Sequence, residues 1–271
     1  MANVISFPKL GITLNLSPVA FSIGNKDIYW YALIILFGFL MGILIASCGC
    51  EKRGVSKDNV LDIALWGIIS GIVGARIYYV LFSLDEFRGD WLSVFRIWEG
   101  GIAIYGGIIG AVISTFIYCK IKKLNVLNTF DACCIGLLLG QAIGRWGNFI
   151  NCEVFGRTTD VLLGMSINGN APVHPLFLYE SLWSFAGVIL LLLLRNKKKR
   201  NGQIFFSYLL WYSAGRLFLE GMRDTRYILY IIPDILGISQ LVAGLLIVIS
   251  IAGLIYVTKS KKKCFKIQQK G

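Results

Sequence analysis

The stretch IYWYALIILFGFLMGILIAS, residues 28–47, contains no charged side chain. About twenty apolar residues in a helix are enough to span the hydrocarbon core of a bilayer. Similar runs recur at 60–83, 101–121, 131–144, 176–194, 204–221 and 235–257. The fourth run is short for a bilayer, and we expect its helix to extend into the polar stretch that follows it. We therefore predict an all-α integral membrane protein with seven transmembrane helices.

The overall composition agrees with this fold class. Of 271 residues, 56% are hydrophobic and only 15% are charged, whereas a soluble domain of this length needs more polar residues to cover its surface. The formal net charge of +12 would suit a nucleic-acid-binding protein, but most lysines and arginines lie in short connections between the apolar runs. We interpret them as signals of membrane orientation and predict no nucleic-acid partner.

The distribution of cations predicts that orientation. Lysines and arginines gather after the first, third and fifth runs and in the C-terminal tail, at Lys52, Arg53 and Lys57, at Lys120, Lys122 and Lys123, at Arg195 and 197–200, and at Lys259, Lys261, Lys262, Lys263, Lys266 and Lys270. Because positively charged loops stay in the cytoplasm, the N-terminus should lie outside and the C-terminus in the cytoplasm. We expect residues 1–27 to form an outward N-terminal arm, 28–257 the seven-helix membrane domain and 258–271 a basic cytoplasmic tail.

A polar cluster follows the fourth run, in GRWGNFINCEVFG at residues 144–156. The flat guanidinium of Arg145 can bind a phosphate through two parallel hydrogen bonds and stays charged when partly desolvated. If the backbone is helical, Arg145 and Asn148 share a face. Asn151, Glu153 and Gly156 complete the cluster. A purely structural alternative is an ion pair between Arg145 and Glu153 within the bundle.

A second charged group lies near the outer end of the sixth run, in GRLFLEGMR at residues 215–223. Arg216, Glu220 and Arg223 are spaced i, i+4 and i+7, which places all three on one helical face. They could neutralise one another as a packing device. Equally, the two arginines could form a second cationic arm for an anionic ligand. The residues alone leave both interpretations open.

The predicted orientation places both groups in the outer half of the membrane, where other polar side chains are also expected: Arg76, Glu99, His174, Tyr179 and Glu180. Ionisable residues inside a membrane usually mark a functional site. Arginines and neutral amides at the lipid–water boundary indicate an anionic phosphate headgroup as the ligand. We therefore expect an outward-facing site for an anionic lipid.

The histidine and the cysteines give no sign of a metal site. His174 is the single histidine in the chain and cannot belong to a multi-histidine site. We interpret it as a loop or capping residue, with a catalytic role as the alternative. The seven cysteines lack paired zinc spacing and fit small hydrophobic positions, although Cys152 adjoins the polar cluster. We predict no metal and no soluble cofactor.

Together these motifs resemble the signature of the bacterial phosphatidylglycerol–prolipoprotein diacylglyceryl transferases. GRWGNFINCEVFG, YWYAL followed by FGF, GARIYYVLF, WEGGIAIYGGIIG, HPLFLYE and GRLFLEGMR occur in the family's order over roughly residues 15–257. The resemblance implies transfer of the diacylglyceryl group of phosphatidylglycerol to the lipobox cysteine of a prolipoprotein, with release of glycerol 1-phosphate. It also implies a multi-pass protein of the bacterial cytoplasmic membrane, whose catalytic domain opens toward the outer leaflet.

The resemblance also assigns residues. It implies catalytic roles for Arg145, Arg216, Tyr31, Asn148, Glu153 and Tyr105, and phosphatidylglycerol binding by Arg145, Arg216, Glu220, Gly156 and Asn151. Tyr105 departs from the pattern, because many members carry a histidine there that has been considered a general base. A neutral tyrosine is a poor base at neutral pH. Either the base lies elsewhere, or Tyr105 orients the substrate while the arginines lower the pKa of the thiol, which is the interpretation we favour.

Two other functions would fit some of these features. A transporter or channel for an anionic solute would also need intramembrane arginines. The ionisable groups gather on one side, however, and no internal repeat is visible in the sequence. In a non-catalytic membrane scaffold, the outward polar cluster would have no purpose.

Overall fold

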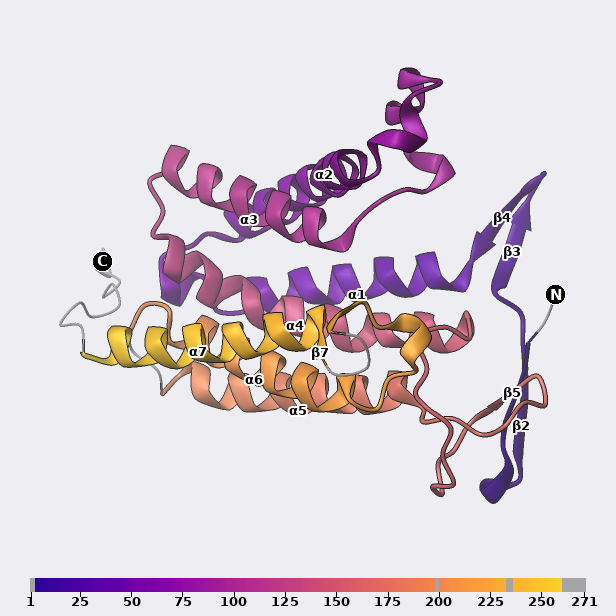
Figure 1. Cartoon of the computed structure of the whole chain (residues 1–271). Helices are drawn as coiled ribbons and strands as arrows, with labels where there is room; N and C mark the ends of the chain where they lie inside the picture. The colour runs from indigo at the N-terminus through magenta and orange to yellow at the C-terminus, as the bar shows by residue number, and fades with distance from the viewer. Residues whose placement is uncertain (1–2, 198–199, 233–235, 260–271) are drawn as a thin grey trace. The chain divides into compact units, whose positions relative to one another are not determined.

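The computed structural model describes residues 3–197, 200–232 and 236–259. Within these residues the chain forms seven α-helices (Figure 1). They are α1 (Trp30–Ser47), α2 (Lys57–Phe82), α3 (Ile104–Ile121), α4 (Val126–Ile150), α5 (Leu176–Arg195), α6 (Gln203–Glu220) and α7 (Ile238–Lys259). Each coincides with an apolar run predicted from the sequence. Most of the predicted basic tail, residues 260–271, and the predicted helix start at 235 lie outside or at the edge of the described ranges.

Six of the helices are long and apolar enough to cross a membrane. The helix that does not reach this hydropathy is α6, which carries Arg216 and Glu220 among several hydroxyl-bearing side chains. The structure thus confirms a mostly helical membrane protein. The polar character of α6 is accounted for by the charged site that it lines.

The fourth helix is longer than the apolar run that predicts it. It begins at Val126, where the Asn125 side chain accepts a hydrogen bond from the Asn128 amide at 3.1 Å, an N-terminal cap. It ends at Ile150 and so includes Arg145 and Asn148. The expected extension into the polar stretch is therefore confirmed, and those two side chains do share a helical face.

Short strands outside the helices were not predicted. They are β1 (Asn3–Phe7), β2 (Ile12–Leu16), β3 (Val19–Ile23), β4 (Lys26–Tyr29), β5 (Ser166–Ile167), β6 (Tyr230–Ile232) and β7 (Leu236–Gly237). They form a sheet of order β2-β1-β5 and the hairpins β3-β4 and β6-β7. In β1, Ile5 is fully buried in an apolar cluster with Phe149, Met165, Ile167, Val173 and Phe177. This cluster anchors the segment between α4 and α5 against β1.

The chain is organised as two compact units, each described by itself. The large unit holds residues 3–46 and the described chain from 133 onward, and the small unit holds residues 47–132. In the large unit, α1 packs on α4 through glycines. A Cβ atom on Gly42 would lie 2.8 Å from the Gly136 carbonyl oxygen, so only small residues allow this approach of the two backbones.

A reciprocal pairing joins α5 and α6, which run side by side in Figure 1. Trp183 lies over Gly215, and Trp211 lies over Gly187. The indole Nε1 of each tryptophan donates to the backbone carbonyl of the other at 3.0 Å, and the two rings stack with centroids 4.5 Å apart. A Cβ atom on Gly215 would lie 2.2 Å from the Trp183 Nε1. We call this contact the tryptophan seam.

In the small unit, α2 packs against α3, and Arg76 organises the loop between them. Its guanidinium donates to the carbonyl oxygens of Val94, Gly100 and Gly101 at 2.8 Å each and of Ser93 at 2.6 Å. Arg76 is 8% exposed. This arginine, expected from the sequence to be part of an outward polar group, therefore has a structural role in its own loop.

We expect Arg76→Ala to increase amide hydrogen exchange in residues 83–103 by about tenfold or more, because hydrogen bonds to a charged group each contribute about 1.5–3 kcal/mol. Hydrogen exchange followed by mass spectrometry checks this. Arg88→Ala is the matched control, since Arg88 is largely exposed and pairs only with Asp85 among the described residues. Unchanged exchange in Arg76→Ala would contradict the structural role.

Candidate active site

Arg145 lies near the C-terminal end of α4, and its ion-pair partner comes from α5. The Arg145 Nη2 lies 2.5 Å from Oε2 of Glu180. The Glu180 side chain is 8% exposed, whereas that of Arg145 is 24% exposed. A buried carboxylate therefore holds an arginine that remains open to a ligand.

The charges of α6 meet the same carboxylate. Arg216 Nη1 lies 3.5 Å from Glu180 Oε1, and Arg216 Nη2 lies 3.3 Å from Glu220 Oε2. Arg223, just after α6, contacts Glu180 Oε1 at 2.9 Å and Glu220 Oε2 at 3.3 Å. Arg145, Glu180, Arg216, Glu220 and Arg223 thus form one group, the arginine–glutamate cluster. It has three cations and two anions, which leaves one positive charge for an anionic ligand.

A small cleft opens onto this cluster. Its lining residues are Gln141, Arg145, Glu180, Trp183, Ser184, Tyr212, Gly215, Arg216 and Leu219. The cavity volume is about 20 Å³, which is room for about one water molecule. Arg145 and Arg216 both face it, whereas Arg223 and Glu220 do not belong to its lining. A phosphate must therefore displace side chains of the cleft to bind there, and it would meet the two arginines together.

The two sequence interpretations of GRLFLEGMR can now be compared. Both Arg216 and Arg223 pair with Glu220, as a self-neutralising ladder would. Arg216 also lines the cleft beside Arg145, as a second cationic arm would. The structure combines the two, because Arg223 is buried with the acids while Arg216 is presented to the cleft.

Asn148 connects Arg145 to Glu153. The Asn148 Nδ2 donates to Glu153 Oε1 at 2.8 Å, and the Arg145 Nη1 donates to Asn148 Oδ1 at 3.5 Å. The structural alternative of a direct Arg145–Glu153 pair is wrong, since the carboxylate that pairs with Arg145 belongs to Glu180. Glu153 acts on the arginine through the amide, which can accept and donate at once.

The turn that carries Glu153 has an unusual backbone. Its neighbours Cys152 and Val154 have φ angles of +53° and +56°, a region that β-branched residues such as valine rarely enter. Strain of this kind often accompanies functional sites. Burial raises the pKa of the Cys152 thiol, which fits the small hydrophobic role expected for this cysteine.

Gly156 lies where three segments meet. Its amide donates to the His174 carbonyl at 3.0 Å, and its backbone bridges to Arg223. A Cβ atom on Gly156 would lie 2.6 Å from the His174 Cβ and 2.7 Å from the Met222 carbonyl oxygen. This glycine is therefore required for a close approach that also positions Arg223.

The remaining predicted residues lie in three places. Tyr31, in the first turn of α1, packs on α4, because a Cβ atom on Gly147 would lie 2.7 Å from its ring. Asn151 follows α4, where its backbone N–H donates to the Gly147 carbonyl oxygen at 3.0 Å. Tyr105 lies in the first turn of α3, within the small unit, and is half-buried there. The structure therefore brings Tyr31 and Asn151 to the cluster-bearing end of α4, and the role of Tyr105 stays a prediction.

The sequence assignment does not include Glu180 in the site, although this residue contacts three arginines. The sequence places it only among several outward polar residues. Its signal in the sequence was an acidic side chain inside a long apolar run, LFLYESLWSF. Such a residue needs a partner or a function in a membrane, but the sequence does not show which cations it meets.

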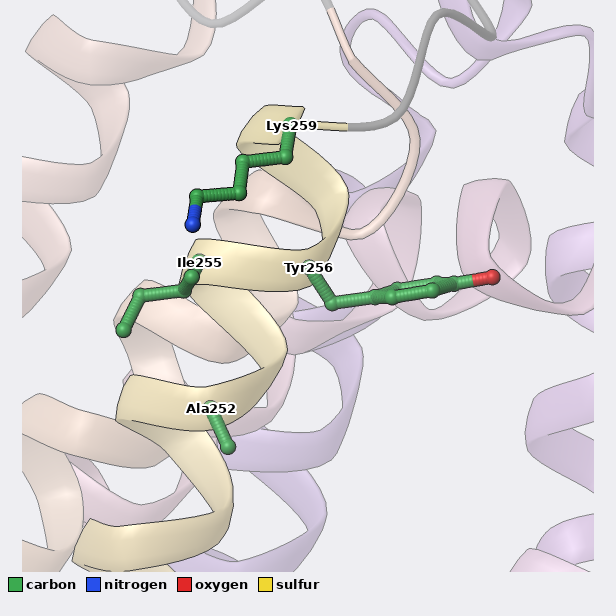
Figure 2. A pocket seen from close by; sticks show the side chains of 4 residues that line it. All are labelled: Ala252, Ile255, Tyr256 and Lys259. Atoms are coloured by element: carbon green, nitrogen blue, oxygen red, sulfur yellow. The ribbon is translucent and has the colours of Figure 1, made fainter.

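A second hollow lies on the surface of α7, formed by Ala252, Ile255, Tyr256 and Lys259 (Figure 2). All four side chains come from one helix, and Figure 2 shows those of Ile255 and Tyr256 extending to opposite sides of it. The charged residue among them, Lys259, ends the helix. This surface lacks the convergent groups of several elements that characterise the arginine–glutamate cluster.

Known proteins resemble this chain over most of its length. The profile of a family described as prolipoprotein diacylglyceryl transferase matches residues 18–256. A phosphatidylglycerol–prolipoprotein diacylglyceryl transferase of Bacillus velezensis is 41% identical over 89% of the chain and 92% of that relative. A relative with the same description in Halalkalibacterium halodurans is 44% identical over 86% of the chain and 83% of that relative. Another in Listeria monocytogenes is 40% identical over 89% of the chain and 90% of that relative.

Proposed function

The chain belongs to the prolipoprotein diacylglyceryl transferase family, and we propose that it transfers the diacylglyceryl group of phosphatidylglycerol to the lipobox cysteine of prolipoproteins. This is the first step of bacterial lipoprotein maturation. The observation that carries the proposal is the pair of cleft-facing arginines, Arg145 and Arg216, held on either side of one carboxylate.

The reaction fits the charges of this site. The cysteine sulfur attacks the glyceryl carbon that bears the phosphate, the carbon–oxygen bond breaks, and glycerol 1-phosphate leaves with the electron pair. Negative charge therefore grows on the phosphate in the transition state. Arginines already oriented by buried glutamates stabilise that charge without reorganising around it. The reaction needs no metal ion and no soluble cofactor.

Each predicted residue has a place in this scheme. Arg145 and Arg216 bind the phosphate and act in catalysis. Glu220 orients Arg216, and Glu153 orients Arg145 through Asn148. Further contributors are Tyr31 and Asn151 at the end of α4, Gly156 through its close backbone approach, and Tyr105 as an orienting residue for the substrate.

The membrane topology follows from the same scheme. All seven helices cross the bacterial cytoplasmic membrane. Among them α6 is less apolar because it carries charged residues of the site. The N-terminus lies outside and the C-terminus in the cytoplasm, as the basic loops after α1, α3 and α5 indicate. The cluster then opens toward the outer leaflet, where phosphatidylglycerol and the signal peptide of the prolipoprotein are both accessible.

Purified protein incubated with phosphatidylglycerol vesicles and a lipobox peptide tests the proposal. We expect glycerol 1-phosphate and thioether-linked diacylglyceryl peptide in equal amounts, both measured by mass spectrometry. A peptide with serine in place of cysteine is the control and should give neither product. If neither forms with the cysteine peptide, the enzyme assignment is lost. Movement of an anionic solute or lipid across the vesicle membrane without the thioether would favour the alternative of a transporter.

A further inference from the structure

The substrate thiol must lose its proton, and the sequence leaves the acceptor of that proton open. Two acids belong to the arginine–glutamate cluster, but they are placed differently. Glu180 lines the cleft, whereas the Glu220 side chain is 1% exposed and lies outside the lining. Of the residues that line the cleft, Glu180 is the one with a carboxylate. It is therefore the acid that a substrate in the cleft can reach.

We propose that Glu180 accepts the proton of the lipobox thiol, and that the phosphate of bound phosphatidylglycerol makes this possible by taking over Arg145 and Arg216. This inference rests on the proposed function. It makes Glu180 a catalytic residue rather than only a support for the arginines.

The contacts of Glu180 show how such an exchange can occur. Oε2 contacts Arg145, while Oε1 contacts Arg223 and, at the longer distance of 3.5 Å, Arg216. The two arginines that line the cleft are the ones that an incoming phosphate meets. Arg223 lies outside the lining and keeps its 2.9 Å hydrogen bond to Oε1. The exchange thus frees Oε2 while Arg223 continues to orient the carboxylate.

The charges around Glu180 make lipid binding a precondition for proton transfer. The groups that face it are Arg145 from α4, Arg216 from α6 and Arg223 after α6, with Glu220 sharing the last two arginines. In the unliganded cluster Oε2 of Glu180 is held by Arg145, and Oε1 is held by Arg216 and Arg223. A phosphate that takes over Arg145 and Arg216 leaves Oε2 open to the thiol. The thiol is thereby activated only when the lipid is in place.

The step is balanced in atoms and charge. The thiol proton moves to Oε2 of Glu180, and the thiolate sulfur forms a bond to the glyceryl carbon. The bond from that carbon to the phosphate oxygen breaks, and its electrons stay on glycerol 1-phosphate, held by Arg145 and Arg216. Glu180 then returns its proton to the departing phosphate or to water. As the product leaves, the two arginines pair with the carboxylate again.

A selenocysteine lipobox peptide separates this role from a supporting one, because a selenol ionises without a base at neutral pH. We expect Glu180→Gln to lower the transfer rate to the cysteine peptide by about 100-fold or more, within the usual contribution of a general base. The loss with the selenocysteine peptide should be at least about tenfold smaller, because there the glutamine weakens only the support of Arg145 and Arg216 and removes no proton acceptor that the reaction needs. The matched control is Glu220→Gln, which removes the other buried acid and should slow both peptides by the same factor.

The proposal would be overturned if Glu180→Gln lost the same activity with both peptides while unfolding at the same temperature as the unsubstituted protein. Glu180 would then be a positioning residue. If Glu180→Gln does not fold, Glu180→Asp withdraws the carboxylate by one methylene and must still slow the cysteine peptide more than the selenocysteine peptide. Failure of the unsubstituted protein to modify either peptide would refute the proposed function instead.

Discussion

Replacing Arg145 with alanine is expected to reduce the rate of glycerol 1-phosphate release by about 10³-fold, the usual effect of removing one group that stabilises a developing anion. Arg145 contacts Glu180 at 2.5 Å and faces the cleft together with Arg216. Arg145→Lys should restore little activity, because an ammonium keeps the charge but cannot make two parallel bonds to a phosphate. The measurement is kcat/KM with phosphatidylglycerol vesicles and a lipobox peptide.

Arg226→Ala is the matched control for the loss of one arginine. Arg226 belongs to the same unit, and its side chain is 69% exposed and pairs with Asp224. We expect its kcat/KM to stay within about twofold of the unsubstituted protein. The double variant of Arg145 and Arg216 should lose less than the product of the two single losses, since both act on one phosphate. Full activity in Arg145→Ala would refute phosphate binding at this cluster.

The second large effect is expected at Gly156. Gly156→Ala introduces a Cβ atom 2.6 Å from the His174 Cβ and 2.7 Å from the Met222 carbonyl, and both neighbours belong to the backbone or lie next to it. The three segments must separate, which should cost about 2 kcal/mol of folding stability. Because Arg223 follows Met222 directly, transfer activity should fall by at least tenfold as well. Thermal unfolding in detergent and the transfer assay measure the two effects.

Gly244→Ala in α7 provides the comparison, because a Cβ atom there meets no neighbour within 4 Å. Alanine should leave activity unchanged and raise stability slightly through its better helix propensity. If Gly156→Ala unfolds at the same temperature as the unsubstituted protein and remains active, the close approach at Gly156 is not required.

The helices were predictable because a membrane span leaves a strong composition signal. All seven apolar runs became helices, and the anticipated extension of the fourth was confirmed. The strands were missed because their signals are short. ITLNL at residues 12–16 does alternate apolar and polar side chains, and Gly11 before it adopts φ +65°. A pattern of five residues, however, is too short to predict a strand by itself.

The site was predictable in its residue types but not in its pairing. Arg145 and Arg216 were recognised from their chemistry, and their position at one cleft supports the prediction. The structural alternative pairs Arg145 with Glu153, which is nearby in the sequence, whereas the structure supplies Glu180 from the next helix. Which faces of two helices meet depends on how each rotates about its axis. Between α4 and α5 the contacts include the Ser181 hydroxyl, which donates to the Ala142 carbonyl oxygen at 2.9 Å, and a single sequence does not reveal such pairings.

The tryptophan seam between α5 and α6 has a consequence for the motions that the reaction needs. Trp183 and Trp211 each fill the space over a glycine of the opposite helix, so moving α5 along α6 would require both rings to leave those positions together. The contact therefore opposes a change of register between the helices that carry Glu180 and Arg216. The proposed exchange of partners then needs only the rotation of the Arg145 and Arg216 side chains, which are 24% and 20% exposed. The membrane-embedded backbone can remain rigid while the charges rearrange.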